Sequence, residues 1–69
     1  MSDPRLASRL KEARQAAGLT QAELAEKAGV SRKTVNTVEN GVFIPSTILA
    51  LSLARALGVT VEELFWLAD

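Results

Sequence analysis

The chain has 69 residues, enough for one small domain spanning residues 1–69 but too few for a large buried core. It contains no cysteine, histidine or tyrosine, which excludes disulfide bridges and the common zinc sites. Because most nucleophiles, general bases and metal ligands are missing, the composition argues against an enzyme and against a cofactor. No apolar run approaches the ~20 residues of a membrane span and no signal peptide is visible, so a cytoplasmic protein is expected.

The charges are unevenly distributed, although eight basic and eight acidic residues give a formal net charge of zero. Residues 5–33 hold seven of the basic residues and three acidic ones, a net charge of +4, whereas residues 34–69 carry −3. The positive half is suited to face nucleic-acid phosphate. The basic residues that could attract phosphate, each equally well explained by solubility alone, include Arg5, Arg9, Lys11 and Lys27.

Capping residues and glycines divide the chain into five short helices. The first is expected to begin at Asp3, an N-cap before Pro4, and to end at Gly18. Capping boxes are expected to open the second helix and the fifth. The later helices are predicted to begin at Thr20, Ser31, Ser46 and Thr60, the fifth carrying Leu64, Phe65 and Trp66. Strand signals are nearly absent, so the predicted fold is all-α, a compact five-helix bundle.

The second and third predicted helices are separated only by Gly29-Val30-Ser31. A turn this tight forces two helices to cross steeply, as they do in a DNA-binding helix-turn-helix. The small Ala25 lets the third helix approach, and Gly29 can adopt the positive φ that a sharp turn requires. Residues 21–40 are therefore predicted to form a helix-turn-helix.

The third predicted helix separates polar from apolar side chains. At about 100° per residue, Val35 and Val38 lie opposite a wholly polar face. Arginine and lysine can donate to guanine O6 and N7, and asparagine can pair with adenine N6 and N7, which are the chemistries of a major-groove reader. A merely solvated face is the alternative. The polar face consists of Arg32, Lys33, Asn36 and Thr37.

Residues 21–40, QAELAEKAGVSRKTVNTVEN, resemble the helix-turn-helix of Cro- and phage-repressor-like (XRE-type) transcriptional regulators. The resemblance continues through GVFIPST and LARALGVTVEELF, so it covers roughly residues 6–65. It implies a bundle of the lambda-repressor-like DNA-binding type, in which the second and third helices form the helix-turn-helix. Short members of this family, which lack an effector domain, act as dimeric repressors.

The resemblance also implies roles for individual side chains. It implies a salt bridge between Arg14 and Glu39 that ties the first helix to the third. The polar face of the third helix would read bases, whereas Gln21, Ser31 and Asn40 would contact phosphate. Each of these three also has a structural explanation that needs no DNA: Gln21 as an exposed side chain at a helix start, Ser31 as an N-cap and Asn40 as a C-cap. The implied DNA-binding set is Gln21, Ser31, Arg32, Lys33, Asn36, Thr37 and Asn40.

The C-terminal part, residues 42–67, holds more apolar side chains than one small core can absorb. It contributes 14 large apolar residues in 26 positions, against eight in residues 1–41. A dimerisation surface is therefore expected here, with core packing as the alternative; Leu51, Leu57, Val59 and Leu64 are assigned to the core. The candidates for the surface are Phe65, Trp66 and Leu67, with Phe43, Ile48 and Leu49 as further members.

The function predicted from the sequence is a sequence-specific DNA-binding transcriptional regulator. It would be a homodimeric repressor that binds a near-palindromic operator on double-stranded DNA through the major groove. Two alternatives stay open. One is an antitoxin that represses its own operon and binds a toxin. The other is a protein-interaction module that does not bind DNA.

Overall fold

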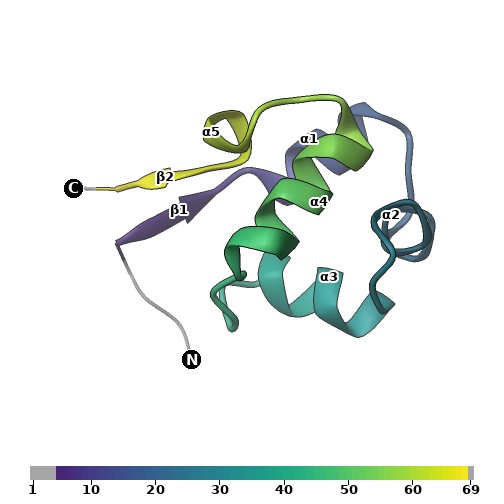
Figure 1. Cartoon of the computed structure of the whole chain (residues 1–69), viewed down its shortest axis with the longest axis horizontal. Helices are drawn as coiled ribbons and strands as arrows, with labels where there is room; N and C mark the ends of the chain where they lie inside the picture. Colours follow the sequence, from purple (N-terminus) through teal and green to yellow (C-terminus); the bar gives the residue numbers. More distant parts are fainter. Residues whose placement is uncertain (1–4, 69) are drawn as a thin grey trace.

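The computed structural model describes residues 5–68 and consists of five helices and a two-stranded antiparallel ribbon (Figure 1). The ribbon extends from one side of the helical body, which has α4 at its centre. In chain order the elements are β1 (Leu6–Ser8), α1 (Leu10–Ala16), α2 (Gln21–Ala28), α3 (Arg32–Glu39), α4 (Thr47–Leu57), α5 (Val61–Leu64) and β2 (Phe65–Leu67). The predicted five-helix, mainly α architecture is confirmed.

The start of the first helix was predicted wrongly. Asp3 and Pro4 lie outside the described residues, and α1 begins only at Leu10. The preceding segment forms β1 because its backbone bonds to the far end of the chain: Arg9 N–H donates to the Leu64 carbonyl at 2.9 Å. Pairing between segments about sixty residues apart thus overrides a local helix signal, which carries no information about so distant a partner.

The prediction that strands are absent also fails at residues 65–67. The fifth helix ends at Leu64, and Phe65 adopts an extended backbone instead of continuing it. In β2, Trp66 pairs with Ala7 and Leu67 with Leu6. Successive side chains of a strand point to opposite faces, so Phe65 and Leu67 share one face of the ribbon and Trp66 lies on the other. Phe65 is buried, whereas Trp66 and Leu67 are exposed.

The predicted caps are confirmed at three of the four later helices. At α2 the capping box is complete: Thr20 N–H donates to Glu23 Oε1 at 2.8 Å, and Glu23 N–H donates to Thr20 Oγ1 at 3.1 Å. As predicted, Ser31 Oγ accepts from a backbone N–H of α3, and Ser46 Oγ accepts from a backbone N–H of α4. The expected box at Thr60 does not form, because this hydroxyl bonds to the Glu63 side chain rather than to the backbone of α5.

The α2 capping box should make the free energy of unfolding depend on pH through Glu23. The hydrogen bond from the Thr20 N–H, and then that from its side chain, lowers the pKa of Glu23 below its ordinary value. A lowered pKa in the folded state stabilises the fold above the unfolded-state pKa, and this stabilisation is lost as the pH falls through the folded-state value. We therefore expect Glu23→Gln to show a smaller acid-induced drop in melting temperature than the wild type. Equal slopes between pH 3 and 7 would contradict this expectation.

The core lies where α1, α2, α3 and α5 pack around α4. Two residues that the sequence left as candidates for the dimer surface, Leu49 and Phe65, are buried in this core. Conversely Leu51, assigned to the core, is 55% exposed. Helical spacing in α4 could not decide between these two leucines, because most of that helix is apolar and only its neighbours determine which side is covered. Within residues 5–68 no helix is long and apolar enough to cross a membrane.

Candidate nucleic-acid interface

The turn between α2 and α3 presents α3 at the surface. Gly29 takes φ of 72°, a left-handed conformation that costs a glycine little. The Val30 N–H then donates to the Ala25 carbonyl at 2.9 Å and ends α2. Ala25 is buried and α3 packs against α2, which confirms that the second and third helices form the predicted helix-turn-helix.

The two sides of α3 differ as the sequence predicted. Val35 and Val38 are buried in the core. On the opposite side Arg32, Lys33 and Asn36 are exposed and Thr37 is half-buried. The Thr37 hydroxyl donates to the Thr34 carbonyl at 3.0 Å. This side of α3 carries two cations, Arg32 and Lys33, and no carboxylate, so the surface is positively charged.

Two hollows border α3. Arg32 lines one of them together with Thr20 and Gln21, at the junction of α1 and α2. Lys33 lines the other, together with Thr37 of α3 and the segment that follows that helix. Each hollow is thus lined by one of the two cations of α3.

The second hollow contains apolar side chains from the segment that the sequence assigned to a dimerisation surface. Val42 and Phe43 line it beside Lys33 and Thr37, and they are 57% and 45% exposed. The sequence placed Phe43 on a dimer surface. Its position three residues after Asn40, the last capping residue of α3, was the signal that could have placed it beside the polar face.

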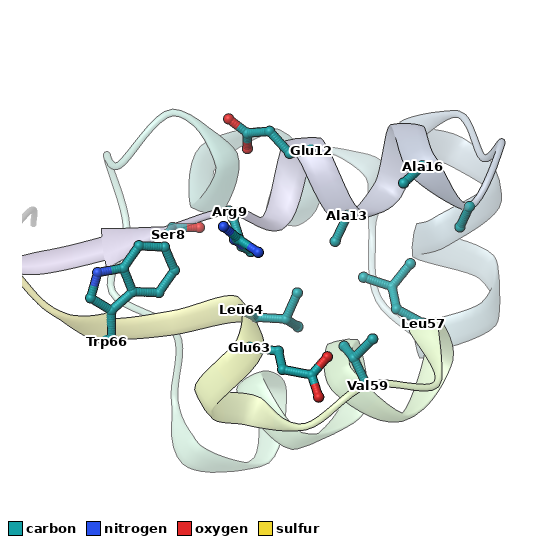
Figure 2. A pocket seen from close by; sticks show the side chains of 11 residues that line it. Ser8, Arg9, Glu12, Ala13, Ala16, Leu57, Val59, Glu63, Leu64 and Trp66 are labelled. Carbon is teal, nitrogen blue, oxygen red and sulfur yellow. The ribbon is translucent and has the colours of Figure 1, made fainter.

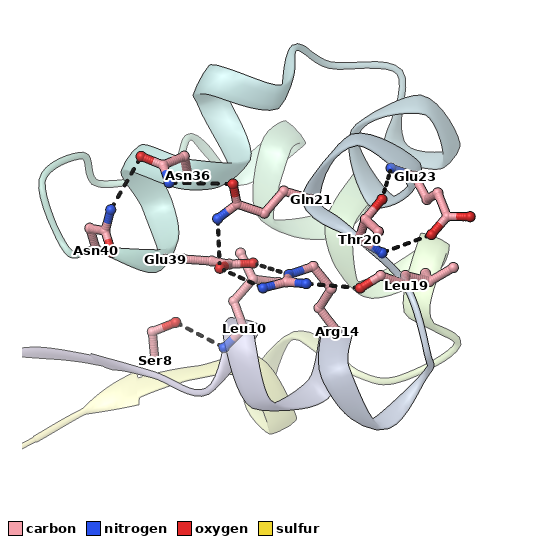
Figure 3. A network of polar contacts seen from close by, with 10 residues as sticks. All are labelled: Ser8, Leu10, Arg14, Leu19, Thr20, Gln21, Glu23, Asn36, Glu39 and Asn40. Carbon is pink, nitrogen blue, oxygen red and sulfur yellow. Dashed lines mark hydrogen bonds and ion pairs between the residues drawn. The ribbon is translucent and has the colours of Figure 1, made fainter.

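A buried ion pair holds α3 to α1 (Figure 3). Arg14 Nε donates to Glu39 Oε2 at 2.6 Å, and Arg14 Nη2 donates to Oε1 at 3.2 Å. The side chains are only 11% and 1% exposed. A third bond, from Arg14 Nη1 to the Leu19 carbonyl at 2.8 Å, fixes the loop before α2. The hydrogen bond to Glu39 raises the pKa of Arg14 further above its ordinary value, so the guanidinium stays charged. The predicted salt bridge is confirmed.

A chain of side-chain amides connects this ion pair to the surface (Figure 3). Gln21 Nε2 donates to Glu39 Oε1 at 3.1 Å, and Gln21 Oε1 accepts from Asn36 Nδ2 at 3.3 Å. Asn36 Oδ1 accepts in turn from Asn40 Nδ2 at 3.2 Å. Three predicted site residues are thus brought together. The sequence did not predict these bonds, although the four-residue spacing of Asn36 and Asn40 on one helix was a usable signal.

Ser31 is not hydrogen-bonded to these amides. Its hydroxyl accepts from the Thr34 N–H at 3.1 Å and shares a 2.8 Å hydrogen bond with the Thr34 hydroxyl. The structure therefore uses Ser31 as the N-cap of α3, the role that needs no DNA.

An open pocket lies between α1, the end of α4 and α5 (Figure 2). It has a volume of about 810 Å³, and its floor is apolar, with Ala13, Leu57 and Val59 among its lining residues. At its edge the Arg9 guanidinium lies 5.7 Å from the centre of the Trp66 ring, within the range of a cation–π contact. Arg9, a candidate for attracting phosphate, is thus placed beside an aromatic ring of β2.

Comparison with known proteins identifies the family. The model of the helix-turn-helix family matches residues 10–64. An uncharacterized HTH-type transcriptional regulator of Methanothermobacter thermautotrophicus is 49% identical over 61 residues, which are 87% of this chain and 88% of the relative.

Two solved structures are also similar. The restriction-modification controller protein C.AhdI from Aeromonas hydrophila is 42% identical with a TM-score of 0.78, over 80% of this chain and 83% of the other. SinR, the master biofilm regulator of Bacillus subtilis, solved in complex with DNA, is 33% identical with a TM-score of 0.74, over 78% and 87%. The chain therefore belongs to the helix-turn-helix family of DNA-binding transcriptional regulators, XRE type, with the lambda-repressor-like fold.

Proposed function

We propose that the protein is a homodimeric repressor that places α3 of each protomer in the major groove of a near-palindromic operator. Recognition helices of a two-fold dimer meet half-sites about 34 Å apart. The observation that carries this proposal is the exposed cationic face of α3, a helix that a buried ion pair holds to α1. The similarity to SinR, which has been solved in complex with DNA, supports DNA binding by this chain.

Within this proposal the polar side chains of the interface have two kinds of contact. The polar side chains of α3 read base edges, and those nearest its start do so most directly, because the N-terminal residues of a recognition helix contact base edges. Side chains at the helix ends contact phosphate and set the register without reading sequence. The base-reading set is Arg32, Lys33, Asn36 and Thr37, and the phosphate set is Gln21, Ser31 and Asn40.

The proposal includes one domain, residues 1–69, whose C-terminal part pairs two protomers. An apolar groove of about 440 Å³ runs between the start of α4 and the ribbon, with Ile44, Leu51 and Leu6 among its lining residues. Ile48, 78% exposed, lies one turn from Leu51 on α4, and Leu67 is the cross-strand partner of Leu6. Exposed large aliphatic side chains gathered around a groove mark interaction sites. Trp66 lies on the opposite face of the ribbon and joins Arg9 instead.

Introducing charge on α4 should separate the protomers. We expect Ile48→Asp combined with Leu51→Asp to be a monomer at concentrations where the wild type is a dimer in sedimentation equilibrium. The monomer should keep its melting temperature within a few degrees, because both side chains are exposed before the change. Val42→Asp, an exposed aliphatic residue outside this groove, is the matched control and should stay dimeric. A wild type that is monomeric at every concentration would contradict the proposed dimer.

The central test is selection of bound fragments from random duplex DNA at physiological salt. The expected result is a consensus with two-fold symmetry and half-sites one helical turn apart. A single unrepeated half-site would retain DNA recognition but remove the homodimer. If no sequence is enriched above the input, the proposal fails, and the protein-interaction alternative becomes the better account of the exposed apolar groove.

A further inference from the structure

We propose that Gln21 and Glu39 fix the orientation of the Asn36 amide, and that this fixed orientation makes Asn36 accept adenine and reject guanine in each half-site. The inference rests on the proposed function, since it concerns how the same surface reads DNA. In it Asn36 contacts the base, whereas Gln21 and Glu39 are positioning residues. The argument follows the direction of each hydrogen bond from the core to the surface (Figure 3).

The direction is set at the buried ion pair. The guanidinium of Arg14 can only donate, and an ionised carboxylate such as Glu39 can only accept. Glu39 Oε1 lies 3.1 Å from the amide of Gln21, so that amide must turn its nitrogen toward the carboxylate. The oxygen and nitrogen of an amide have nearly the same shape, and the hydrogen-bond network decides between them. Here the Glu39 carboxylate fixes which end of the Gln21 amide is the nitrogen.

The orientation of the Gln21 amide in turn sets the orientation of the Asn36 amide on α3. With its nitrogen committed to Glu39, Gln21 offers only its oxygen to Asn36, which donates Nδ2 at 3.3 Å. The opposite end of the Asn36 amide then accepts from Asn40 Nδ2 at 3.2 Å. Reversing Asn36 would set oxygen against oxygen at Gln21 and nitrogen against nitrogen at Asn40. A single orientation is therefore favoured for a side chain that is exposed.

The bonds already made determine what Asn36 can still offer. A side-chain amide has two N–H donors and two acceptor lone pairs, and Asn36 uses one of each within the protein. One donor and one acceptor remain. Adenine presents an acceptor, N7, beside a donor, N6, in the major groove, whereas guanine presents two acceptors, N7 and O6. The remaining pair matches adenine and sets the Asn36 oxygen against guanine O6. An asparagine with both N–H groups free would discriminate less.

Selection from random duplexes tests this with three variants and the wild type. The wild type should prefer adenine to guanine at one position of each half-site by about tenfold to a hundredfold. Asn36→Ala should lose that preference while the rest of the consensus stays. Gln21→Ala, which keeps Asn36 but frees its amide, should reduce the adenine-to-guanine ratio to about threefold or less at that position alone. Gln15→Ala, an exposed glutamine on α1, is the matched control and should keep the ratio.

A charge swap separates orientation from simple loss of a contact. Glu39→Gln adds a donor beside position 21, so the downstream amides can reverse and the ratio should fall. Combining it with Gln21→Glu restores an acceptor-only group between the new amide and Asn36, and the ratio should recover. Thermal melting verifies that each variant folds. If Glu39→Gln does not fold, the comparison of Gln21→Ala with the wild type still decides.

The outcomes separate this inference from the proposed function. A wild-type consensus whose adenine-to-guanine ratio is unchanged in Gln21→Ala overturns the positioning by Gln21 and Glu39 but leaves the proposed function standing. A consensus that is unaffected by Asn36→Ala overturns base reading by Asn36. A swapped pair that folds but stays at the ratio of Glu39→Gln also overturns the inference. A wild type that enriches no sequence overturns both.

Discussion

Replacing Arg32 and Lys33 together by alanine is expected to abolish sequence-specific DNA binding. Each lost base contact weakens binding by about 1–3 kcal/mol, and the proposed dimer would lose both contacts at both half-sites. The affinity for the selected operator should therefore fall by at least about a thousandfold, measured by fluorescence anisotropy at fixed salt. Folding should be unaffected, because both side chains are exposed at the start of α3.

The control for this double variant removes the same charge elsewhere. Lys27 and Arg55 line a hollow between α2 and α4 that does not include α3. Replacing both by alanine should leave the recognised sequence unchanged and at most reduce the salt-dependent, sequence-independent part of binding. If the two double variants lose operator affinity equally, the effect is general electrostatics, and the assignment of α3 as the base-reading element is wrong.

Arg14→Ala is expected to have the largest effect on the free energy of unfolding. It removes the partner of Glu39, whose side chain is 1% exposed, and leaves the Leu19 carbonyl without its donor. Breaking a buried ion pair from one side costs about 3–5 kcal/mol, because an uncompensated charge stays buried. At about 3 kcal/mol the melting temperature of a domain this size should fall by roughly 12–24 °C. Thermal unfolding followed by circular dichroism measures it.

Two comparisons test the physical reason. Arg9→Ala removes an arginine from the start of the same helix, where the guanidinium lies over Trp66, and should cost less than about 1 kcal/mol. Replacing Arg14 and Glu39 together by leucine should recover much of the loss, because an apolar pair leaves no buried charge. A double variant as unstable as Arg14→Ala would show that packing, rather than the stranded carboxylate, sets the cost.

The elements nearest the interface could be predicted because their signals are local. The N-caps Thr20 and Ser31 each bond to a backbone N–H three residues away, and Gly29 ends α2 through its own backbone conformation. The polar face of α3 follows from helical periodicity once those boundaries are known. None of these features needs a contact distant in the sequence, so the sequence by itself specified the helix-turn-helix and the side chains it exposes.

Tertiary structure decided the features that depend on distant partners. Residues 6–8 and 65–67 form strands only because each finds the other across the chain, and the strand alternation then separates Trp66 from Leu67. Whether an apolar residue of α4 is covered depends on which side its neighbours occupy, as Leu49 and Leu51 show.

The orientation of the Asn36 amide is also set at a distance, through Gln21, by a carboxylate on the buried side of α3. The sequence thus determined which groups can face DNA, because helix signals are short-range. Only the folded chain determined how these groups are fixed and which apolar surface remains exposed, because both depend on contacts between residues far apart in the sequence.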